Sequence, residues 1–150
     1  MRIESDYLGK LYNPVQLRTI VERTIEVIKD LQASRQIDTI VCTGLSGQGV
    51  GFPTSMLTGI PLLVMRKPGD NTHAYGQIEG NVEFGTYIIV DDGISSGATV
   101  DRLVEKVSVF NPRAVCVGIV LWDSYQDRQW YHPEGKGISL PVFVSGLKGF

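Results

Sequence analysis

Short runs of apolar, often β-branched residues recur along the chain, and helical patterns or glycine-containing turns separate them. Such continuous runs are typical of strands that are buried on both faces of a sheet. Between them, apolar residues recur at helical spacing in 13–34, behind the capping pair Asn13 and Pro14, and a helix is also predicted at 97–110. A shorter helix is expected to end near Gly59. The strands are predicted at Ile37–Thr43, Pro61–Arg66, Thr86–Asp91, Ala114–Trp122 and Pro141–Ser145.

This alternation predicts an α/β fold, a mainly parallel twisted sheet with helices on both faces, because parallel strands are joined by right-handed helical crossovers. No internal repeat, linker or low-complexity tract divides the chain, so residues 1–150 are expected to form a single domain. The segment Lys67–Gly85 is polar and contains four glycines, and we expect it to be a mobile excursion. Asp123–Gly137 is expected to be a polar insert.

Composition excludes several classes of protein. A formal net charge of -2 leaves no basic face of the kind that nucleic acid binding requires. The longest apolar run is too short to cross a membrane, and Met1–Asp6 mixes both charges where a secretory signal would be apolar, so a cytoplasmic location is expected. Cys42 and Cys116 lie in separate apolar runs, and neither histidine has a metal-ligand spacing, so no disulfide or zinc site is predicted.

The most informative stretch is Tyr87–Thr99, an apolar strand that ends in the adjacent carboxylates Asp91 and Asp92 and is followed by a small, hydroxyl-rich turn into a helix. Backbone amides at a helix start have no acceptor within the helix, so they can bind a phosphate, and nearby Ser and Thr hydroxyls add donors. Two neighbouring carboxylates can accept hydrogen bonds from a vicinal diol. The residues therefore predict a site for ribose 5-phosphate.

This stretch resembles the phosphoribosyl-diphosphate (PRPP) binding signature of the type I phosphoribosyltransferases. The resemblance implies the fold of that family, with a short C-terminal segment that covers the base. It also implies Mg²⁺, held mainly by PRPP and pyrophosphate rather than by protein ligands. The implied PRPP-binding residues are Asp91, Asp92, Gly93, Ile94, Ser95, Ser96, Gly97, Ala98 and Thr99.

A second segment, Thr43–Gly47, resembles the pyrophosphate loop of the same family. The resemblance implies a cis peptide bond, which we place between Leu45 and Ser46. Relatives carry Arg or Lys near position 46, so Ser46 offers only a neutral donor. A P-loop and a dinucleotide-binding loop are not supported, because Val50 stands where the P-loop lysine belongs and the glycine spacing is wrong for the other motif. The implied pyrophosphate-binding residues here are Gly44, Leu45, Ser46 and Gly47.

A third segment, Leu62–Lys67, resembles the strand that precedes a flexible closing loop in adenine and orotate phosphoribosyltransferases. It implies that Arg66 and Lys67 neutralise the diphosphate, although a solvated basic pair at a strand end is the alternative. Loop closure over the reaction centre excludes water. The loop residues expected to reach the site are His73, Tyr75 and Glu79.

The base-binding residues are expected after the fourth strand, where relatives build a wall over the nucleobase. Trp122 and Tyr125 are the candidates, because an aromatic ring can stack on a base, and core packing is the alternative for Trp122. The Asp-Arg pair of orotate-type enzymes is absent at Trp122–Ser124, although Arg128 lies nearby. A purine is therefore favoured over orotate.

The resemblance implies a Mg²⁺-dependent transferase of nucleotide salvage that moves ribose 5-phosphate from PRPP to a nucleobase. Asp91, Asp92 and Lys67 are the candidate catalytic residues, and a homodimer is expected. One alternative is a regulator that senses PRPP without catalysis. Another is a hydrolase or salvage enzyme with a different acceptor.

Overall fold

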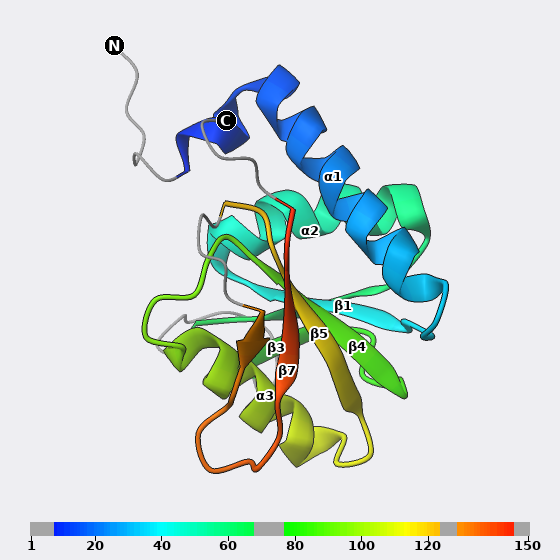
Figure 1. Cartoon of the computed structure of the whole chain (residues 1–150), viewed down its shortest axis with the longest axis vertical. Helices are drawn as coiled ribbons and strands as arrows, with labels where there is room; N and C mark the ends of the chain where they lie inside the picture. Colours follow the sequence, from blue (N-terminus) through cyan, green and yellow to red (C-terminus); the bar gives the residue numbers. More distant parts are fainter. Residues whose placement is uncertain (1–7, 68–76, 124–128, 146–150) are drawn as a thin grey trace.

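The computed structural model describes residues 8–67, 77–123 and 129–145. It is built around a seven-stranded sheet with the strand order β3-β2-β1-β4-β5-β7-β6 (Figure 1). The elements are η1 (Gly9–Tyr12), α1 (Pro14–Gln32), β1 (Thr39–Thr43), α2 (Gly44–Thr58), β2 (Leu62–Met65), β3 (Ile78–Gly80), β4 (Thr86–Asp91), α3 (Ala98–Phe110), β5 (Val115–Leu121), β6 (Trp130–Tyr131) and β7 (Leu140–Val144).

The five central strands β2, β1, β4, β5 and β7 run parallel, and the outer strands β3 and β6 pair antiparallel to their neighbours. The expected mainly parallel α/β fold is therefore confirmed. In β1 and β4, Val41 lies opposite Ile89. Because the two strands are parallel neighbours, their last residues, Thr43 and Asp91, lie at the same edge of the sheet.

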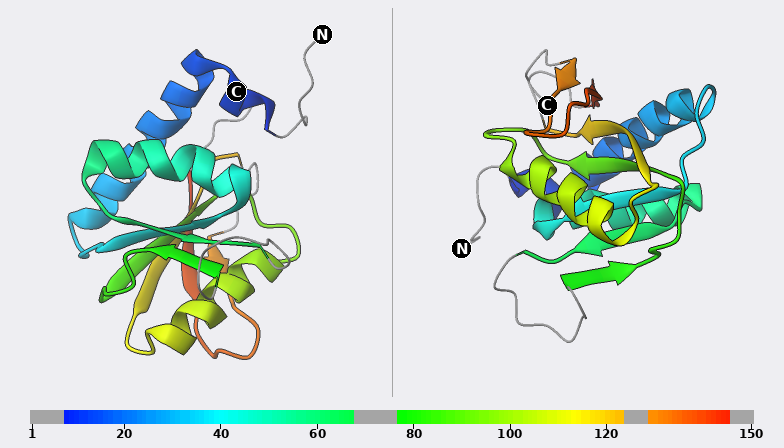
Figure 2. Two further views of the ribbon diagram at one scale, coloured as in Figure 1. Left: turned by 180° about the vertical axis from the view of Figure 1, so that it is seen from behind. Right: turned by 90° about the horizontal axis from the view of Figure 1, so that it is seen from below.

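Helices cover both faces of the sheet: α1 and α2 lie on one face and α3 on the other (Figure 2). Successive strand side chains point to opposite faces, so each strand contributes to two cores. Val41, Ile89 and Ile119 belong to the core under α3, and their neighbours Ile40 and Ile88 belong to the core under α1 and α2. This two-sided burial explains the continuous apolar runs in the sequence.

Helix α1 begins as the sequence predicts. The Asn13 side-chain oxygen accepts hydrogen bonds from the backbone N–H groups of Val15 and Gln16, at 3.0 and 3.2 Å. Pro14 occupies the first helical position, where a backbone N–H would have no acceptor within the helix, so the proline costs no hydrogen bond. The helix then packs Ile20 and Ile28 against the sheet.

Three local expectations are corrected by the structure. The glycine-rich segment 44–51 is not a turn but the first half of α2, which starts directly after β1. Leu45 and Ser46 lie in its first helical turn, and no peptide bond among the described residues is cis, so the expected cis bond is wrong. Part of the polar excursion after Lys67 is the edge strand β3, and the insert after Asp123 contains β6, because both gain hydrogen bonds from a neighbouring strand.

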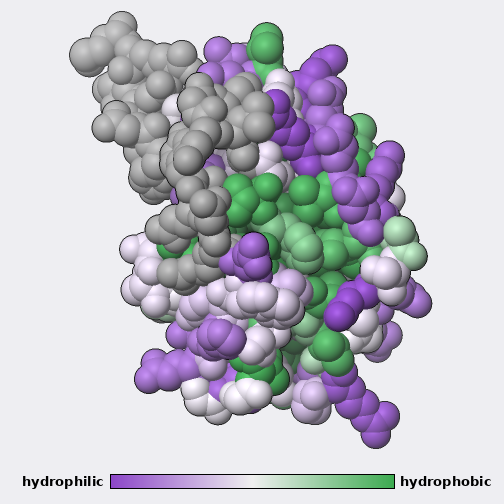
Figure 3. Space-filling view, in the orientation of Figure 1, coloured by the Kyte–Doolittle hydropathy of each residue, from purple (hydrophilic) through white to green (hydrophobic). Residues whose placement is uncertain are grey.

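Within 8–67, 77–123 and 129–145, no helix combines the length and the apolar character needed to span a bilayer. Figure 3 shows apolar residues gathered on the face where β5 and β7 lie nearest the viewer, beside the polar outer surface of α1. On β7, Phe143 is half-buried and Val144 is 36% exposed.

Candidate functional site

A cavity of about 230 Å³ opens where β1 and β4 end. In a parallel sheet, ligands bind at the carboxyl ends of the strands, so its position is the one expected for a binding site. The residues that line it are Thr43, Ser46, Lys67, Asp91, Asp92, Gly93, Ile94, Ser95, Ser96, Gly97, Ala98, Thr99 and Val100. The cavity thus brings together all residues from Asp91 to Thr99 with Ser46 and Lys67.

The two adjacent aspartates differ in their surroundings. Asp91 is 6% exposed, and its Oδ1 accepts hydrogen bonds from Ser46 Oγ at 3.2 Å and from the Asp92 backbone N–H at 2.9 Å. Burial, and after it the charge of Asp92, raises the pKa of Asp91 to about 7. Asp92 is less buried, and its Oδ1 accepts from the Gly93 N–H at 2.8 Å. One carboxyl group is therefore close to half-protonated at neutral pH.

The turn after the aspartates requires a glycine at position 97. Its φ of +88° lies in the left-handed region, and a Cβ at this position would collide with the Tyr131 hydroxyl oxygen. The hydroxyl oxygen of Tyr131, from β6, lies 2.7 Å from Asp101 Oδ1 and 3.1 Å from the Gly97 carbonyl oxygen, and these two acceptors share its one proton. Since Gly97 is the N-cap of α3, these contacts position the start of that helix at the cavity.

The start of α2 lies on the other side of the cavity. Thr43 is its N-cap, and Gly44 follows with a φ of +64°. A Cβ at Gly44 would lie 2.8 Å from Lys67 Cε, so the lysine side chain passes directly over this backbone. The ammonium group of Lys67 and the amides of α2 therefore face the same space.

The charges and hydrogen-bonding groups of the cavity favour a ligand with an anionic group next to several hydroxyl groups. Two helices, α2 and α3, begin at its wall, and their first N–H groups carry partial positive charge that no acceptor within the helix offsets. Lys67 adds a full positive charge. The Asp91 and Asp92 carboxylates provide acceptors between these donors. Phosphate groups fit the helix starts, and sugar hydroxyls fit the carboxylates.

Several predicted site residues lie outside the cavity lining. Arg66 points to the β3 side, where its guanidinium forms an ion pair with Glu79 at 2.8 Å. Gly44 and Leu45 lie in the first turn of α2, and Gly47 is buried against β1. The loop residues His73 and Tyr75, and the candidate base-binding Tyr125, lie outside the described residues.

Trp122 is a core residue in this structure, the alternative that the sequence left open. It is 2% exposed, and its indole N–H donates to the Ser46 carbonyl at 2.8 Å, so it supports the cavity from behind rather than lining it. The next residue, Asp123, donates its backbone N–H to the Asp92 carbonyl at 2.9 Å. The end of β5 is thus bonded to both the acidic turn and α2.

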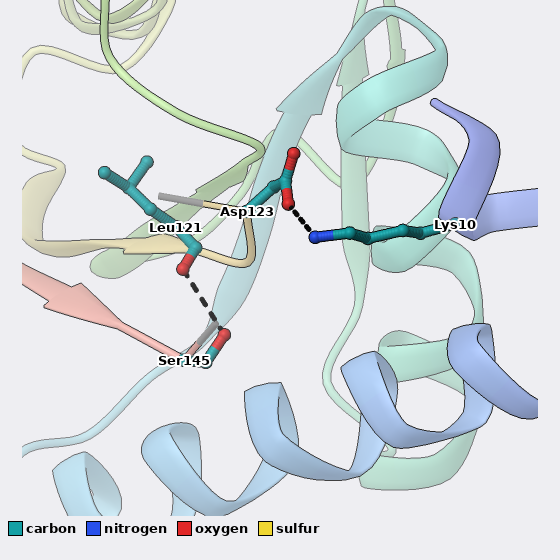
Figure 4. A network of polar contacts seen from close by, with 4 residues as sticks. All are labelled: Lys10, Leu121, Asp123 and Ser145. Carbon is teal, nitrogen blue, oxygen red and sulfur yellow. Dashed lines mark hydrogen bonds and ion pairs between the residues drawn. The ribbon is translucent and has the colours of Figure 1, made fainter. Parts of the chain in front are cut away.

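Asp123 also fastens this region to the start of the described chain. Its carboxylate forms an ion pair with Lys10 of η1, at 2.6 Å, and both side chains are mostly buried (Figure 4). One residue before Trp122, the Leu121 carbonyl accepts a hydrogen bond from the Ser145 hydroxyl at 3.4 Å. Segments from both ends of the described chain therefore brace the strand end next to the aspartates.

Sequence reasoning missed several residues that shape the site. Thr43 lines the cavity, and its hydroxyl donates to the Met65 carbonyl and accepts from Arg102 of α3. Thr43 could have been predicted as a site residue, because its hydroxyl stands at the end of a buried strand. Nothing in the local sequence marks Arg102, and none of it predicts that Tyr131, one of the aromatic residues after the fourth strand, contacts Gly97, because each reaches the site from a distant element.

The family resemblance implies Mg²⁺, and the cavity contains oxygen atoms of the kind that this ion binds. Among the residues that the structure describes, no three His, Cys, Asp or Glu side chains gather as a ligand set. Two carboxylates and several hydroxyls do line the cavity, and Mg²⁺ is commonly bound by one or two carboxylates together with substrate phosphates and water. The residues therefore fit a Mg²⁺ ion that arrives with a phosphorylated ligand.

Comparison with known proteins identifies the fold. No protein-family model matches the chain, and no curated protein matches it. Solved structures do. A phosphoribosyltransferase of Corynebacterium diphtheriae has a TM-score of 0.66 and 19% identity, over 95% of this chain and 86% of that one.

Two further structures with the same architecture are phosphoribosyltransferases whose names state the base. Adenine phosphoribosyltransferase of Saccharomyces cerevisiae, complexed with D-2,5-dideoxy-2,5-imino-altritol 1,6-bisphosphate and adenine, has a TM-score of 0.64 and 20% identity, over 93% of this chain and 84% of that one. Orotate phosphoribosyltransferase of Francisella tularensis has a TM-score of 0.64 and 18% identity, over 91% and 68%. The chain therefore has the type I phosphoribosyltransferase fold that its sequence predicts.

Proposed function

We propose that this chain is a phosphoribosyltransferase that moves ribose 5-phosphate from PRPP to a nucleobase, a purine by preference, and releases pyrophosphate. The observation that carries the proposal is the cavity in which the buried Asp91 and the partly exposed Asp92 lie beside the starts of two helices, with Lys67 in the lining. PRPP combines a vicinal diol with two groups of phosphates, and this donor and acceptor pattern matches it.

In the proposed reaction, the first turn of α3 binds the 5-phosphate, and Asp91 and Asp92 accept hydrogen bonds from the 2- and 3-hydroxyls of the ribose. The start of α2 and Lys67 face the diphosphate. A base nitrogen forms a bond to C1, the bond from C1 to the diphosphate oxygen breaks, and the electron pair leaves with pyrophosphate. The base proton passes to solvent.

Asp91 and Asp92 also place negative charge near C1, which gains positive charge as the diphosphate departs. Such preorganised electrostatic stabilisation is commonly the largest contribution to catalysis. Lys67 and the α2 amides stabilise the opposite charge on the leaving group. Bound Mg²⁺ would supply further charge neutralisation on the diphosphate.

The preference for a purine rests on sequence. The segment 51–67 resembles adenine-type enzymes, and the Asp-Arg pair of orotate-type enzymes is absent after β5. The base is proposed to bind beside the segment that follows Trp122. A homodimer, a cytoplasmic location and a single domain over 1–150 stay predictions.

A second candidate, a PRPP-binding protein without catalysis, has one observation in its favour. Among the described residues that line the cavity, Lys67 is the only cationic side chain, because Arg66 is paired with Glu79 and Ser46 stands where relatives have a cation. Weaker neutralisation of the leaving group would slow its departure while leaving the ribose contacts intact.

The deciding experiment is incubation with PRPP, Mg²⁺ and, in turn, adenine, hypoxanthine, guanine and orotate, with pyrophosphate release as the readout. Release that depends on one of the purines supports the proposal. Saturable PRPP binding with no release for any base favours the binding protein. Base-independent release from PRPP indicates a hydrolase and contradicts the transferase assignment.

A further inference from the structure

A second and larger cavity, of about 480 Å³, lies at the opposite end of the sheet. It is enclosed by α3, by the first residues of β4 and β5, and by the connection between β6 and β7. Tyr87 and Cys116 line it from the sheet, Val104 from α3, and Trp130 and Leu140 from β6 and β7. Tyr87 precedes Asp91 by four strand residues, which is about 13 Å, so this cavity is separate from the candidate active site.

The mouth of this cavity exposes large apolar side chains. Val115, Trp130 and Ile138 all line it and are 54%, 55% and 44% exposed. Three such residues grouped at one opening differ from the scattered exposed apolar residues of an ordinary surface, and grouped ones mark binding sites. A Trp side chain at an opening offers a flat apolar surface together with an N–H donor.

The interior is mostly apolar. Tyr87 is 2% exposed, and the Cys116 thiol donates a hydrogen bond to the Gly118 carbonyl at 3.5 Å. Burial raises the pKa of the Cys116 thiol to about 12, so this group is a neutral part of the wall at physiological pH. The body of a ligand in this cavity would therefore be apolar.

The charges at the cavity are positive on balance. Arg35 and Lys136 both line it. Lys136 forms an ion pair with Glu105 of α3, whereas no side chain among the described residues pairs with the Arg35 guanidinium. One uncompensated guanidinium beside an apolar cavity matches a ligand that carries a single negative charge, since Arg binds carboxylate and sulfonate-like groups through several N–H donors.

We propose that this cavity binds a small organic anion with an aromatic or aliphatic body, with Arg35 at the anionic group and Trp130 against the apolar body. Its volume falls within the range of about 300 to 1,000 Å³ that is usual for small-molecule sites. The site stands independently of the proposed transferase activity, because it shares no lining residue with the first cavity.

The test uses 8-anilinonaphthalene-1-sulfonate, an aromatic anion whose fluorescence rises in apolar sites. Titrated into the full-length chain, it should bind saturably with one site per chain. The sequence has two tryptophans, and their indole N–H signals in a ¹⁵N-resolved NMR spectrum act as local reporters. The Trp130 signal should shift, whereas that of Trp122, which is bonded behind the other cavity, should not.

Variants locate the site. Arg35→Glu should weaken the binding of the probe by about fivefold or more, because it replaces attraction by repulsion. The matched control is Arg18→Glu, at an exposed position of α1, which should leave affinity within about twofold. Ser108→Phe places a ring in the cavity and should reduce the affinity for the probe at least about tenfold. Thermal unfolding shows whether this variant folds. If it does not fold, the result with Arg35→Glu decides the proposal.

Four outcomes would overturn the proposal. The first is no saturable binding by the folded chain, and the second is an equal effect of Arg35→Glu and Arg18→Glu on affinity. The third is a shift of the Trp122 signal that pyrophosphate reverses, which would put the probe in the first cavity. The fourth is that the chain forms a dimer, that Trp130→Ser dissociates it and that the probe does not bind, which would make this surface a contact between copies of the chain.

Discussion

Asp91 and Asp92 are neighbours in sequence, but the fold gives them different chemistry. Asp91 is the last residue of β4 and is buried between Ser46 and the sheet, whereas Asp92 begins the turn and is less buried. A pKa near 7 means that Asp91 gains charge over the physiological range. Asp92 is therefore the carboxylate that we propose as the main hydrogen-bond acceptor for the ribose.

Replacement of Asp92 tests that role. Asp92→Asn should lower kcat/KM for PRPP by about 100-fold or more, because an acceptor and a negative charge are lost next to C1. The thermal unfolding midpoint should change little, since the Asp92 carboxylate is partly exposed and accepts its hydrogen bond from the adjacent Gly93 amide.

The control for this change is Asp30→Asn, at an exposed position of α1, which removes the same charge far from the cavity. Its kinetics should match those of the unmodified chain. Full turnover by Asp92→Asn would refute the assigned role of Asp92.

The pKa of Asp91 predicts a pH-dependent stability. In the unfolded chain this carboxyl group titrates near its ordinary value of 3.8, and in the folded chain near 7. Between these values the folded chain binds more protons, so its free energy of unfolding falls as the pH rises through the interval. The contribution is full below pH 4 and lost above pH 7.

Asp91→Asn should remove this dependence, because the amide keeps an oxygen for Ser46 and for the Asp92 N–H but does not ionise. Urea unfolding at pH 5 and pH 8 measures it. From pH 5 to pH 8, the free energy of unfolding of the unmodified chain should fall by about 1 kcal/mol or more relative to that of the variant. If the two chains differ in free energy of unfolding by the same amount at pH 5 and at pH 8, Asp91 does not have a raised pKa.

At the scale of elements, the site depends on two helices that start where strands end. Their first turns come from different sequence patterns: a glycine-rich segment for α2 and a Ser-Ser-Gly turn for α3. The glycines of 44–51 lower helix propensity, so the sequence predicts a loop there. Packing of Val50 and its neighbours in the core under α1 and α2 outweighs that propensity.

The start of α3 gives a sharp test at Gly97. Gly97→Ala should destabilise the chain by more than about 2 kcal/mol and abolish phosphate binding, because φ is +88° and the new Cβ would collide with Tyr131. Chemical denaturation and calorimetry with ribose 5-phosphate measure the two effects.

Gly93→Ala is the matched control in the same turn, since nothing lies within 4 Å of a Cβ there. It should leave the free energy of unfolding within about 0.5 kcal/mol of the unmodified value. Equal losses in the two variants would mean that the contact between Gly97 and Tyr131 does not order the turn.

At the scale of the whole molecule, ligand binding and folding are linked. The site draws on β1, β4, α2 and α3, and β5 and η1 brace it through Asp123 and Lys10. A ligand that binds only this assembled arrangement must stabilise the fold as a whole. At about 100 times its dissociation constant, such a ligand adds about 2.7 kcal/mol.

Ribose 5-phosphate with Mg²⁺ should therefore raise the thermal unfolding midpoint by roughly 5 to 10 °C at that concentration. 2-Deoxyribose 5-phosphate retains the phosphate but lacks one hydroxyl of the diol, so at equal concentration it should raise the midpoint less. Differential scanning fluorimetry compares the two. Equal shifts would show that the paired carboxylates do not bind the diol.

The sequence by itself determined the class of fold and the centre of the site. Buried parallel strands need apolar residues on both faces, and the acidic motif is contiguous from Tyr87 to Thr99, so both are local patterns that a reader of the sequence can recognise. The tertiary structure alone decided which distant side chains complete the site. Tyr131 at Gly97, Lys67 over Gly44, Arg66 held by Glu79 and Trp122 turned into the core all depend on segments that meet only in the folded chain. Their contacts arise from strand order and packing, which no local pattern encodes.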